Sequence, residues 1–285
     1  MANLKDIRKR ILSVKNTQKV TKAMKLVAAA KLRRAQNAAQ ASRIYMDNLL
    51  AVARRVAAAA GEDLPVLMNR RNVKKIDLVL FTSDRGLCGG FNENLLRAVK
   101  NWIAEKTASG FEVYPIVLGK KGRESLSRAR LKAHVIADQV PESHPEAITH
   151  KVSTLLTERY YAEETDSVVL VYNHFISAGR QEVLFDELIP LSAETSAEYG
   201  IEYLCEPERK KLLAEICEET ILGTIRQAFL DSYASELASR MQAMDSATKN
   251  ASDMIADLAL VYNRARQAAI TSELIDILGG AEAIQ

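Results

Sequence analysis

The sequence predicts a mixed α/β fold. Its N- and C-terminal helices pair as a long antiparallel coiled coil, and the residues between them form a layered α/β/α domain. Three observations lead to this prediction. Apolar or small residues recur at alternating steps of three and four at both ends of the chain, the middle alternates short apolar runs with helical stretches, and the two ends carry opposite net charge. The predicted segments are residues 1–60, 61–206 and 207–285.

The C-terminal segment, after Pro207, contains no further proline and keeps its three-four rhythm to the end. Steps that average about 3.5 residues stay on one helix face only if the helix supercoils against a partner. A helix of about 70 residues would be roughly 105 Å long and would project from an ordinary domain. The seam positions are Leu213, Ile216, Thr220, Gly223, Gln227, Leu230, Ala234, Leu237, Met241, Met244, Thr248, Ala251, Ile255, Leu258, Tyr262, Ala265 and Ala269.

The partner helix is predicted at the other end of the same chain. Because one helix opens the chain and the other closes it, the two can pair antiparallel without another protein. Many seam residues are small and bury little area each, so we expect a slender coiled coil that its own seam stabilises only moderately. The N-terminal seam runs through Leu4, Ile7, Ile11, Val14, Gln18, Thr21, Lys25, Ala28, Leu32, Ala35, Ala39, Ser42, Met46, Leu49, Ala53, Val56 and Ala60.

The middle segment begins with an apolar strand, a glycine-rich turn and a helix, the opening of a Rossmann-like α/β/α domain. The last two strands are predicted to form a hairpin through the turn at residues 177–180. We expect strands at 74–82, 111–118, 133–136, 167–175 and 181–189, and helices at 92–106, 120–129 and 146–161.

The glycine-rich turn at residues 83–90 is a candidate phosphate site. It fits neither GxGxxG nor GxxxxGK[ST], and no Lys-Ser or Lys-Thr follows it. We therefore expect the glycines to permit a tight turn between strand and helix, with Asn92 capping the helix that follows. The sequence predicts no cofactor.

Charge is distributed unevenly along the chain, although its formal net charge is only +3. Residues 1–60 hold 14 Lys or Arg against 2 acids, residues 61–205 hold 17 against 21, and residues 206–285 hold 8 against 13. Opposite charge favours pairing of the terminal helices and leaves a basic stripe on the first. The stripe is either a solvated face or a surface for an acidic protein partner. A nucleic-acid binder is less favoured because the seam runs through the basic segment.

No catalytic or metal-binding set emerges from the spacing. The histidines His134, His144, His150 and His174 are scattered, and the cysteines Cys88, Cys205 and Cys217 match neither a zinc site nor CxxC, so we expect reduced thiols. An enzyme with a long arm would need a polar set at the strand ends, which the sequence does not offer. No apolar run is long enough to span a membrane and no apolar signal core follows Met1, so we expect a soluble protein made in the cytoplasm.

Three blocks of sequence carry a family resemblance. They are ILSVKNTQKVTKAMKLVA at residues 11–28, TSDRGLCGGFN at 82–92, and YNRARQAAITSELID at 262–276 followed by Gly280-Ala281. Together, in this order and spacing, they closely resemble the gamma subunits of F-type ATP synthases over the whole chain.

The resemblance implies a central rotor stalk that is not itself catalytic. Such a subunit couples proton or sodium flow through the membrane ring of c subunits to ATP synthesis or hydrolysis in the ring of alpha and beta subunits. It also implies an epsilon subunit as partner, no nucleic acid, and a peripheral place on the cytoplasmic face of a bacterial inner membrane.

The resemblance further implies which residues touch other subunits. Lys22, Met24 and Lys25 fall in the segment that faces an acidic lever loop of beta. Arg266 and Gln267 fall where family members touch a catch loop of beta. The last turns match the tip held in an apolar sleeve, with Ile270, Thr271, Leu274 and Leu278 as contact residues. Photosynthetic relatives carry a regulatory cysteine pair in an inserted loop. That insertion is missing around Cys205 and Cys217, which argues against thiol regulation.

The glycine-rich turn yields a first prediction. Because it lacks a phosphate-binding lysine, the isolated chain should neither hydrolyse ATP nor bind it usefully. Isothermal titration calorimetry tests this, and micromolar ATP binding that is lost when Gly89 is changed would overturn it.

Overall fold

The computed structural model describes residues 4–60, 64–137, 145–191 and 208–282. The chain forms two compact units, one of residues 1–29 with 240–285 and one of residues 30–239. The predicted division into 1–60, 61–206 and 207–285 stays a prediction. Cys205 and His144 lie outside the described residues.

The two terminal helices form as predicted. Helix α1 runs from Leu4 to Ala60 and helix α5 from Arg209 to Glu282. In the first unit, contacts join residue 18 to 252, 21 to 248 and 25 to 245, so the helices run antiparallel. In the second unit, residue 43 meets 231 and residue 45 meets 219, in the same sense. Predicted seam positions are buried in both helices, among them Ala28, Leu32, Ala35, Ala39, Met46, Leu213, Leu230, Ala234, Leu237, Met244 and Ala251.

The middle of the chain forms a five-stranded sheet in the order β3-β2-β1-β4-β5. The first four of these strands are parallel, and β5 returns antiparallel to β4 as the predicted hairpin. The strands are β1 (Lys75–Phe81), β2 (Glu112–Leu118), β3 (His134–Ala137), β4 (Ser167–Ser177) and β5 (Arg180–Ile189). The other helices are η1 (Val66–Met68), which the sequence pattern did not predict, α2 (Phe91–Ala108), α3 (Lys120–Arg128) and α4 (Glu146–Tyr161).

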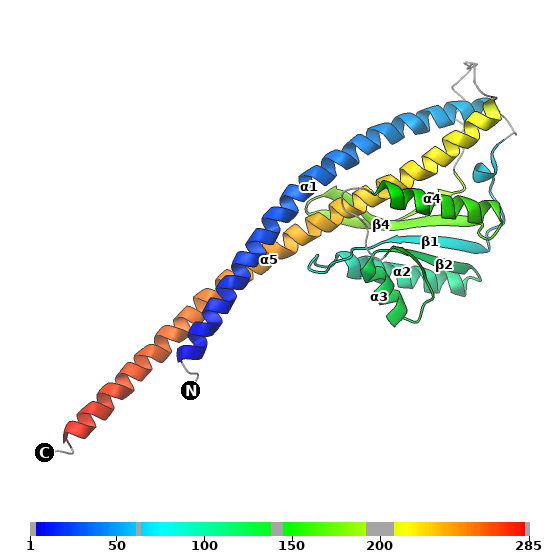
Figure 1. The fold of residues 1–285 in the computed structure, drawn as a ribbon. Coiled ribbons are helices and arrows are strands. Elements are labelled where there is room, and N and C mark those ends of the chain that lie inside the picture. Colours follow the sequence, from blue (N-terminus) through cyan, green and yellow to red (C-terminus); the bar gives the residue numbers. More distant parts are fainter. Residues whose placement is uncertain (1–3, 61–63, 138–144, 192–207, 283–285) are drawn as a thin grey trace. The chain divides into compact units, whose positions relative to one another are not determined.

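Helices cover both faces of this sheet, which confirms the α/β/α layering (Figure 1). Alternate residues of a strand point to opposite faces, so β1 supplies Leu78 and Leu80 to one core and Val79 and Phe81 to the other. The first core packs on α2 and α3. The second packs on α4 and on the α5 residues between Leu213 and Leu230. Because the start of α5 completes the second core, that helix belongs both to the layered domain and to the coiled coil.

A buried ion pair ties β1 to α4. The Asp77 side chain is 1% exposed, and its carboxylate accepts hydrogen bonds from Arg159 at 2.8 and 3.1 Å. Burial raises the pKa of Asp77, and the hydrogen bond to Asp77 raises the pKa of Arg159. Arg159 also pairs with Glu164 at 2.7 Å and lies over the Tyr114 ring. Removing either partner would leave a charge with little solvent, so this pair fixes where α4 lies on the sheet.

The glycine-rich turn differs from its prediction in one respect. Helix α2 begins at Phe91 after Gly90, and no side chain caps it. The predicted cap by Asn92 is wrong: its Oδ1 accepts a hydrogen bond from the Ser83 backbone N–H at 3.0 Å, and its Nδ2 donates to Ser83 Oγ at 2.6 Å. Asn92 Nδ2 also lies 3.3 Å from the sulfur of buried Cys88. Asn92 therefore closes the turn from inside the helix.

Two glycines of the sheet's carboxyl edge give a stability prediction. A Cβ at Gly119 would lie 2.1 Å from the Thr82 carbonyl oxygen, and its φ of +97° is unfavourable for other residues. Gly119→Ala should lower the free energy of unfolding by about 3 kcal/mol or more, from backbone strain and overlap together. Urea unfolding measures this.

The matched control is Gly86→Ala, because nothing lies within 4 Å of a Cβ at Gly86. That variant should unfold close to wild type. Equal unfolding midpoints for the two variants would contradict the description of this edge.

Candidate functional site

Within the first unit, the seam of the coiled coil is polar around residues 18–25 of α1. Gln18 Nε2 donates a hydrogen bond to Ser252 Oγ at 2.6 Å, and the hydroxyls of Thr21 and Thr248 lie 2.8 Å apart. Lys25 Nζ forms an ion pair with Asp245 at 2.6 Å. Hydrogen bonds are directional, so these pairs fix the register of the two helices in a way that small apolar residues do not.

A groove with a basic rim lies over this polar seam. Seven residues line it: Gln18, Lys19, Lys22, Lys25, Asp245, Thr248 and Ser252. Lys22 and Lys25, both predicted contact residues, differ in exposure and in ion pairing. Lys22 is exposed, whereas Lys25 is half-buried and bound to Asp245. Met24, the third, is half-buried beside them. Lys22 therefore offers its charge to solvent, while the charge of Lys25 is engaged within the chain.

Asp245 is a residue that the sequence analysis did not single out. Its second carboxylate oxygen pairs with Lys249 at 3.0 Å, one turn further along α5. The hydrogen bond from Lys25, followed by that from Lys249, lowers the pKa of Asp245. Lys25 and Asp245 carry opposite charges at facing positions of the two helices, which could have indicated the pair. Recognising it requires the register of the coiled coil, because the two residues are 220 positions apart in the sequence.

The predicted contact residues at the C-terminal end of α5 are exposed. Arg266, Gln267, Ile270, Thr271 and Leu274 all lie on the described helix, and Ile270 and Leu274 are 49% and 55% exposed. The hydroxyl of Thr271 donates to the Gln267 carbonyl at 2.9 Å within the helix. Leu278 lies on the helix, but its side chain is outside what the structure describes.

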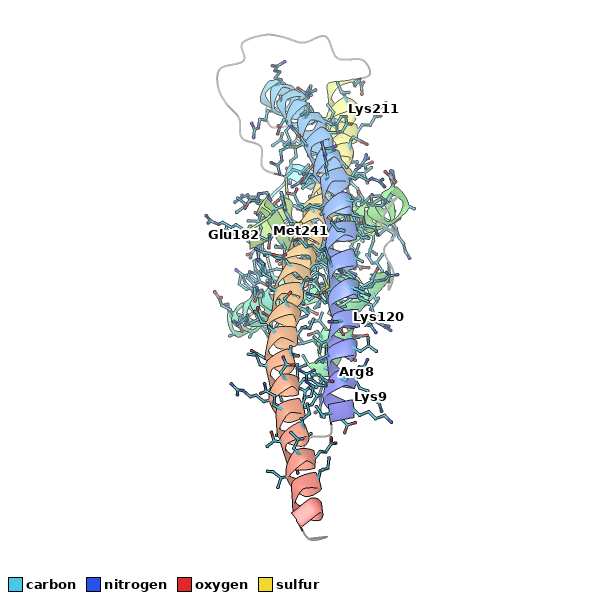
Figure 2. The ribbon with its side chains drawn as sticks, turned by 90° about the vertical axis from the view of Figure 1, so that its left-hand side faces the viewer. Arg8, Lys9, Lys120, Glu182, Lys211 and Met241 are labelled. Carbon is cyan, nitrogen blue, oxygen red and sulfur yellow. The ribbon has the colours of Figure 1, made fainter. Side chains whose placement is uncertain are left out.

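The register of the coiled coil explains this exposure. Residues 18, 21 and 25 face 252, 248 and 245, so the start of α1 at Leu4 falls opposite Arg266. The turns of α5 beyond Arg266 continue past the described start of α1 (Figure 2). Apolar side chains without a neighbouring helix remain in water unless something else covers them.

The predicted contact residues therefore form two separate groups. Asp245, which holds Lys25, and Arg266 are 21 residues apart on one helix, roughly 30 Å at 1.5 Å per residue. The groove group presents positive charge, and the tip group presents donors next to apolar side chains. The two groups therefore differ both in position along α5 and in chemistry.

In the part of the chain that the structure describes, no group of three or more His, Cys, Asp or Glu residues could hold a metal ion. His174 is bound to the buried carboxylate of Asp231 at 2.9 Å. Burial raises the pKa of the Cys217 thiol to about 11, which disfavours the reactive thiolate.

None of the described helices combines the length and the apolar character that crossing a membrane requires.

Comparisons with known proteins agree on one family. The family model described as ATP synthase matches residues 3–284. The ATP synthase gamma chain of Geobacter metallireducens is 45% identical over 287 residues, and that of Trichlorobacter lovleyi is 44% identical over 288, each covering all of both chains. The gamma chain of Rhodospirillum rubrum is 42% identical over 302 residues with the same coverage.

Solved structures show the same arrangement of elements. A chain from the central stalk and c-ring of the Tetrahymena thermophila mitochondrial ATP synthase is 31% identical, with a TM-score of 0.57 over 80% of this chain and 99% of that one. A chain from the Euglena gracilis mitochondrial ATP synthase is 16% identical, with a TM-score of 0.69 over 99% and 94%, and supports the fold alone.

Two long antiparallel helices that flank an α/β/α domain along the sequence define a class of mixed α/β proteins with a coiled coil of terminal helices. The full-length identities are more specific, and they show that this chain belongs to the gamma chain family of ATP synthases.

The Lys25–Asp245 pair gives a titration prediction. In Lys25→Met the pKa of the Asp245 carboxyl should rise toward its ordinary value but not reach it, because Lys249 remains. Carbon-detected NMR over a pH series measures it on the full chain. Since the folded pKa is lowered, the stabilisation is present above the ordinary Asp pKa and is lost as pH falls through the folded value.

Lys22→Met is the matched control, since it removes the same charge from the same groove without touching Asp245. It should leave the Asp245 titration close to that of the unchanged chain. An equal rise in both variants would mean that the general field of the basic stripe, rather than the specific pair, sets the pKa.

Proposed function

We propose that this chain is the central rotor stalk of an F-type ATP synthase. As a rotor it couples proton or sodium flow through a membrane ring of c subunits to ATP synthesis or hydrolysis in a ring of alpha and beta subunits. The observation that carries the proposal is the full-length identity of 42–45% to bacterial ATP synthase gamma chains. The match to a central stalk chain at 31% identity supports the same role.

The chain itself is not the catalyst in this proposal. The glycine-rich turn is closed by Asn92, Ser83 and Cys88 and carries no phosphate-binding lysine. Its contribution is mechanical: an asymmetric coiled coil presents different surfaces to the subunits around it as it turns. Alpha and beta subunits, an epsilon subunit and the c-ring are the partners, and nucleic acid is not one.

The basic rim of the groove suits an acidic loop of beta. Lys19 and Lys22 line the groove and are exposed, so both present charge to solvent there. Lys25 lines the groove beside them, and Met24 is half-buried next to Lys25 along α1. Because an ion pair in water contributes little and breaks readily, such a contact can form and release with each turn. The family resemblance assigns Lys22, Met24 and Lys25 to one contact. The exposed charge of Lys22 and the ion-paired charge of Lys25 give these two residues different roles in it.

The tip of α5 combines two kinds of contact. We call the apolar surface that tolerates sliding the bearing, and the hydrogen-bond donors of Arg266 and Gln267 the latch. The exposed apolar residues Ile270 and Leu274, with Leu278 one turn further along the sequence, suit an apolar sleeve, because apolar contact is non-directional and tolerates sliding. Arg266 and Gln267 offer directional donors, with Thr271 beside them, and a charge-assisted hydrogen bond contributes about 1.5–3 kcal/mol. Such a bond holds one subunit of the ring at one angle and must break on rotation.

The complex, and not this chain, provides the attachment to the membrane. The chain is a peripheral subunit at the cytoplasmic face of a bacterial inner membrane in this proposal. Co-purification tests both statements. A tagged copy of the full chain, recovered from detergent-solubilised membranes of its host, should bring with it alpha, beta, epsilon and c subunits. Recovery of the chain alone in the soluble fraction would contradict the proposal.

The groove yields a prediction about coupling. Lys22→Glu in the assembled complex should lower the number of ions pumped per ATP hydrolysed while leaving the stability of the chain unchanged, because Lys22 is exposed. ATPase assays and vesicle acidification, measured together, give this ratio. Arg10→Glu, on an exposed position of the same helix outside the groove, is the matched charge reversal. Equal ratios for both variants and wild type would show that the basic rim is only solvated.

The tip yields a second prediction of a different kind. Arg266→Ala and Gln267→Ala should change ATP turnover with modest loss of assembly, because each removes a donor and keeps the apolar face. Leu274→Asp and Leu278→Asp should chiefly weaken binding of the chain to the alpha-beta ring, since each places a charge in the apolar sleeve. Quantifying ring-bound chain and ATPase rate decides between them. An identical fall in assembly across all four variants would mean that latch and bearing are not separable.

A further inference from the structure

A row of polar residues on α5 faces the β4–β5 hairpin within the second unit. The four residues are spaced four apart and therefore lie on one side of the helix. We refer to them as the polar ladder: Gln227, Asp231, Ser235 and Ser239. Gln227 is also a position of the predicted seam, whereas Asp231, Ser235 and Ser239 lie outside that seam.

Three members of the polar ladder bind the hairpin directly. The Asp231 carboxylate lies 2.9 Å from His174 Nδ1 on β4. The Ser235 hydroxyl donates to the backbone carbonyl of Asn173 at 2.8 Å, and both residues are buried. The Ser239 hydroxyl donates to Gln181 Oε1 on β5 at 3.1 Å. Three successive turns of α5 are therefore bonded to the same two strands.

Asp231 also joins the second long helix to this contact. Its side chain is 4% exposed, and Arg43 of α1 lies 3.5 Å from the carboxylate oxygen that meets His174. The other oxygen accepts a hydrogen bond from Gln227 at 3.1 Å. One buried carboxylate thus connects α1, α5 and β4. Leaving such a group unpaired is costly, so the three elements are held in one mutual arrangement.

The geometry of these contacts differs from that of the apolar packing around them. Apolar contacts between α5 and the sheet resist separation, but they are non-directional and tolerate small rotations of the helix about its own axis. Hydrogen bonds weaken steeply when their angles change. Because the polar ladder extends over three turns, rotation or sliding of α5 would break all of its bonds together.

We propose that the polar ladder is the joint that locks α5 to the α/β/α domain against rotation about the helix axis. This inference rests on the proposed rotor function, in which torque generated on the coiled coil has to reach the domain. The ladder carries that torque, and the apolar core around it supplies adhesion. Asp231 is the central positioning residue, because it alone also fixes α1.

The test removes the ladder from the assembled complex with little change in size. The ladder variant combines Asp231→Asn, Ser235→Ala and Ser239→Ala. The control variant combines Glu215→Gln with Thr224→Ala, which removes a carboxylate and a hydroxyl from the same helix. Glu215 is exposed, and the Thr224 hydroxyl donates within α5 to the Thr220 carbonyl at 2.8 Å. Ions pumped per ATP hydrolysed are measured in vesicles with and without an opposing ion gradient.

The ladder variant should assemble and hydrolyse ATP, but against the gradient its pumping ratio should fall about twofold or more, since each lost hydrogen bond weakens the joint severalfold. Without the gradient the ratio should stay close to wild type. A general loss of stability would instead lower assembly and both ratios equally, and that result would overturn the inference. So would a ratio against the gradient equal to that of the control variant.

A covalent link gives an independent readout. Ser239→Cys and Gln181→Cys place two thiols where the side chains now touch, in a chain that also carries Cys205→Ser, Asp231→Asn and Ser235→Ala. Joining them with a short bis-maleimide should restore the pumping ratio against the gradient. If joining the thiols leaves the ratio low in a fully assembled complex, the loss did not arise at this joint. Failure of the wild-type chain to assemble or pump would instead contradict the proposed rotor function.

Discussion

The antiparallel pairing of α1 with α5 is the constraint on which the rest of this molecule depends. The helices are the first and last elements of the chain, and every element between them must fit between the end of one and the start of the other. The pairing brings residues more than 200 positions apart into contact. Small seam residues allow close approach but contribute little burial. Polar contacts therefore set the register in both units, through Lys25 and Asp245 in one and through Arg43 and Asp231 in the other.

The chemistry of α5 changes along its length in a way that fits three tasks. Its first turns complete the core of the α/β/α domain through large apolar residues such as Leu213. Its middle turns pair with α1 through small and polar side chains. Its last turns extend past the start of α1 and expose Ile270 and Leu274. A single uninterrupted helix can serve all three because α-helical hydrogen bonds are local, so its backbone needs no partner where the surroundings change.

Much of the fold could be predicted because its signals are local. Period-3.5 seams marked both long helices, and alternating apolar runs marked all five strands; the bounds of α4 were predicted to the residue. The error at Asn92 arose because an Asx residue near a helix start resembles a cap, whereas its side chain bonds to Ser83 across the turn. The short helix η1 was missed because three residues show no period.

The candidate site was only partly predictable for a related reason. Lys22 and Lys25 look alike in sequence, and only the pairing of α1 with α5 shows that Lys25 forms an ion pair with Asp245. Asp231, Ser235 and Ser239 of the polar ladder were missed because they lie between the predicted seam positions, and their partners on β4 and β5 are more than 50 residues away. Arg266 and Gln267 remain predictions from family resemblance, since the other half of that contact belongs to another subunit.

Direct observation of rotation would show whether this chain turns inside the alpha-beta ring. The chain would be assembled with alpha and beta subunits fixed to a surface, with a probe attached through Ser127→Cys on the exposed face of α3. With ATP supplied, the probe should turn continuously in one direction and pause once for each beta subunit. A probe that stays still or moves without direction, while the fixed ring hydrolyses ATP and retains the chain, would contradict the rotor function.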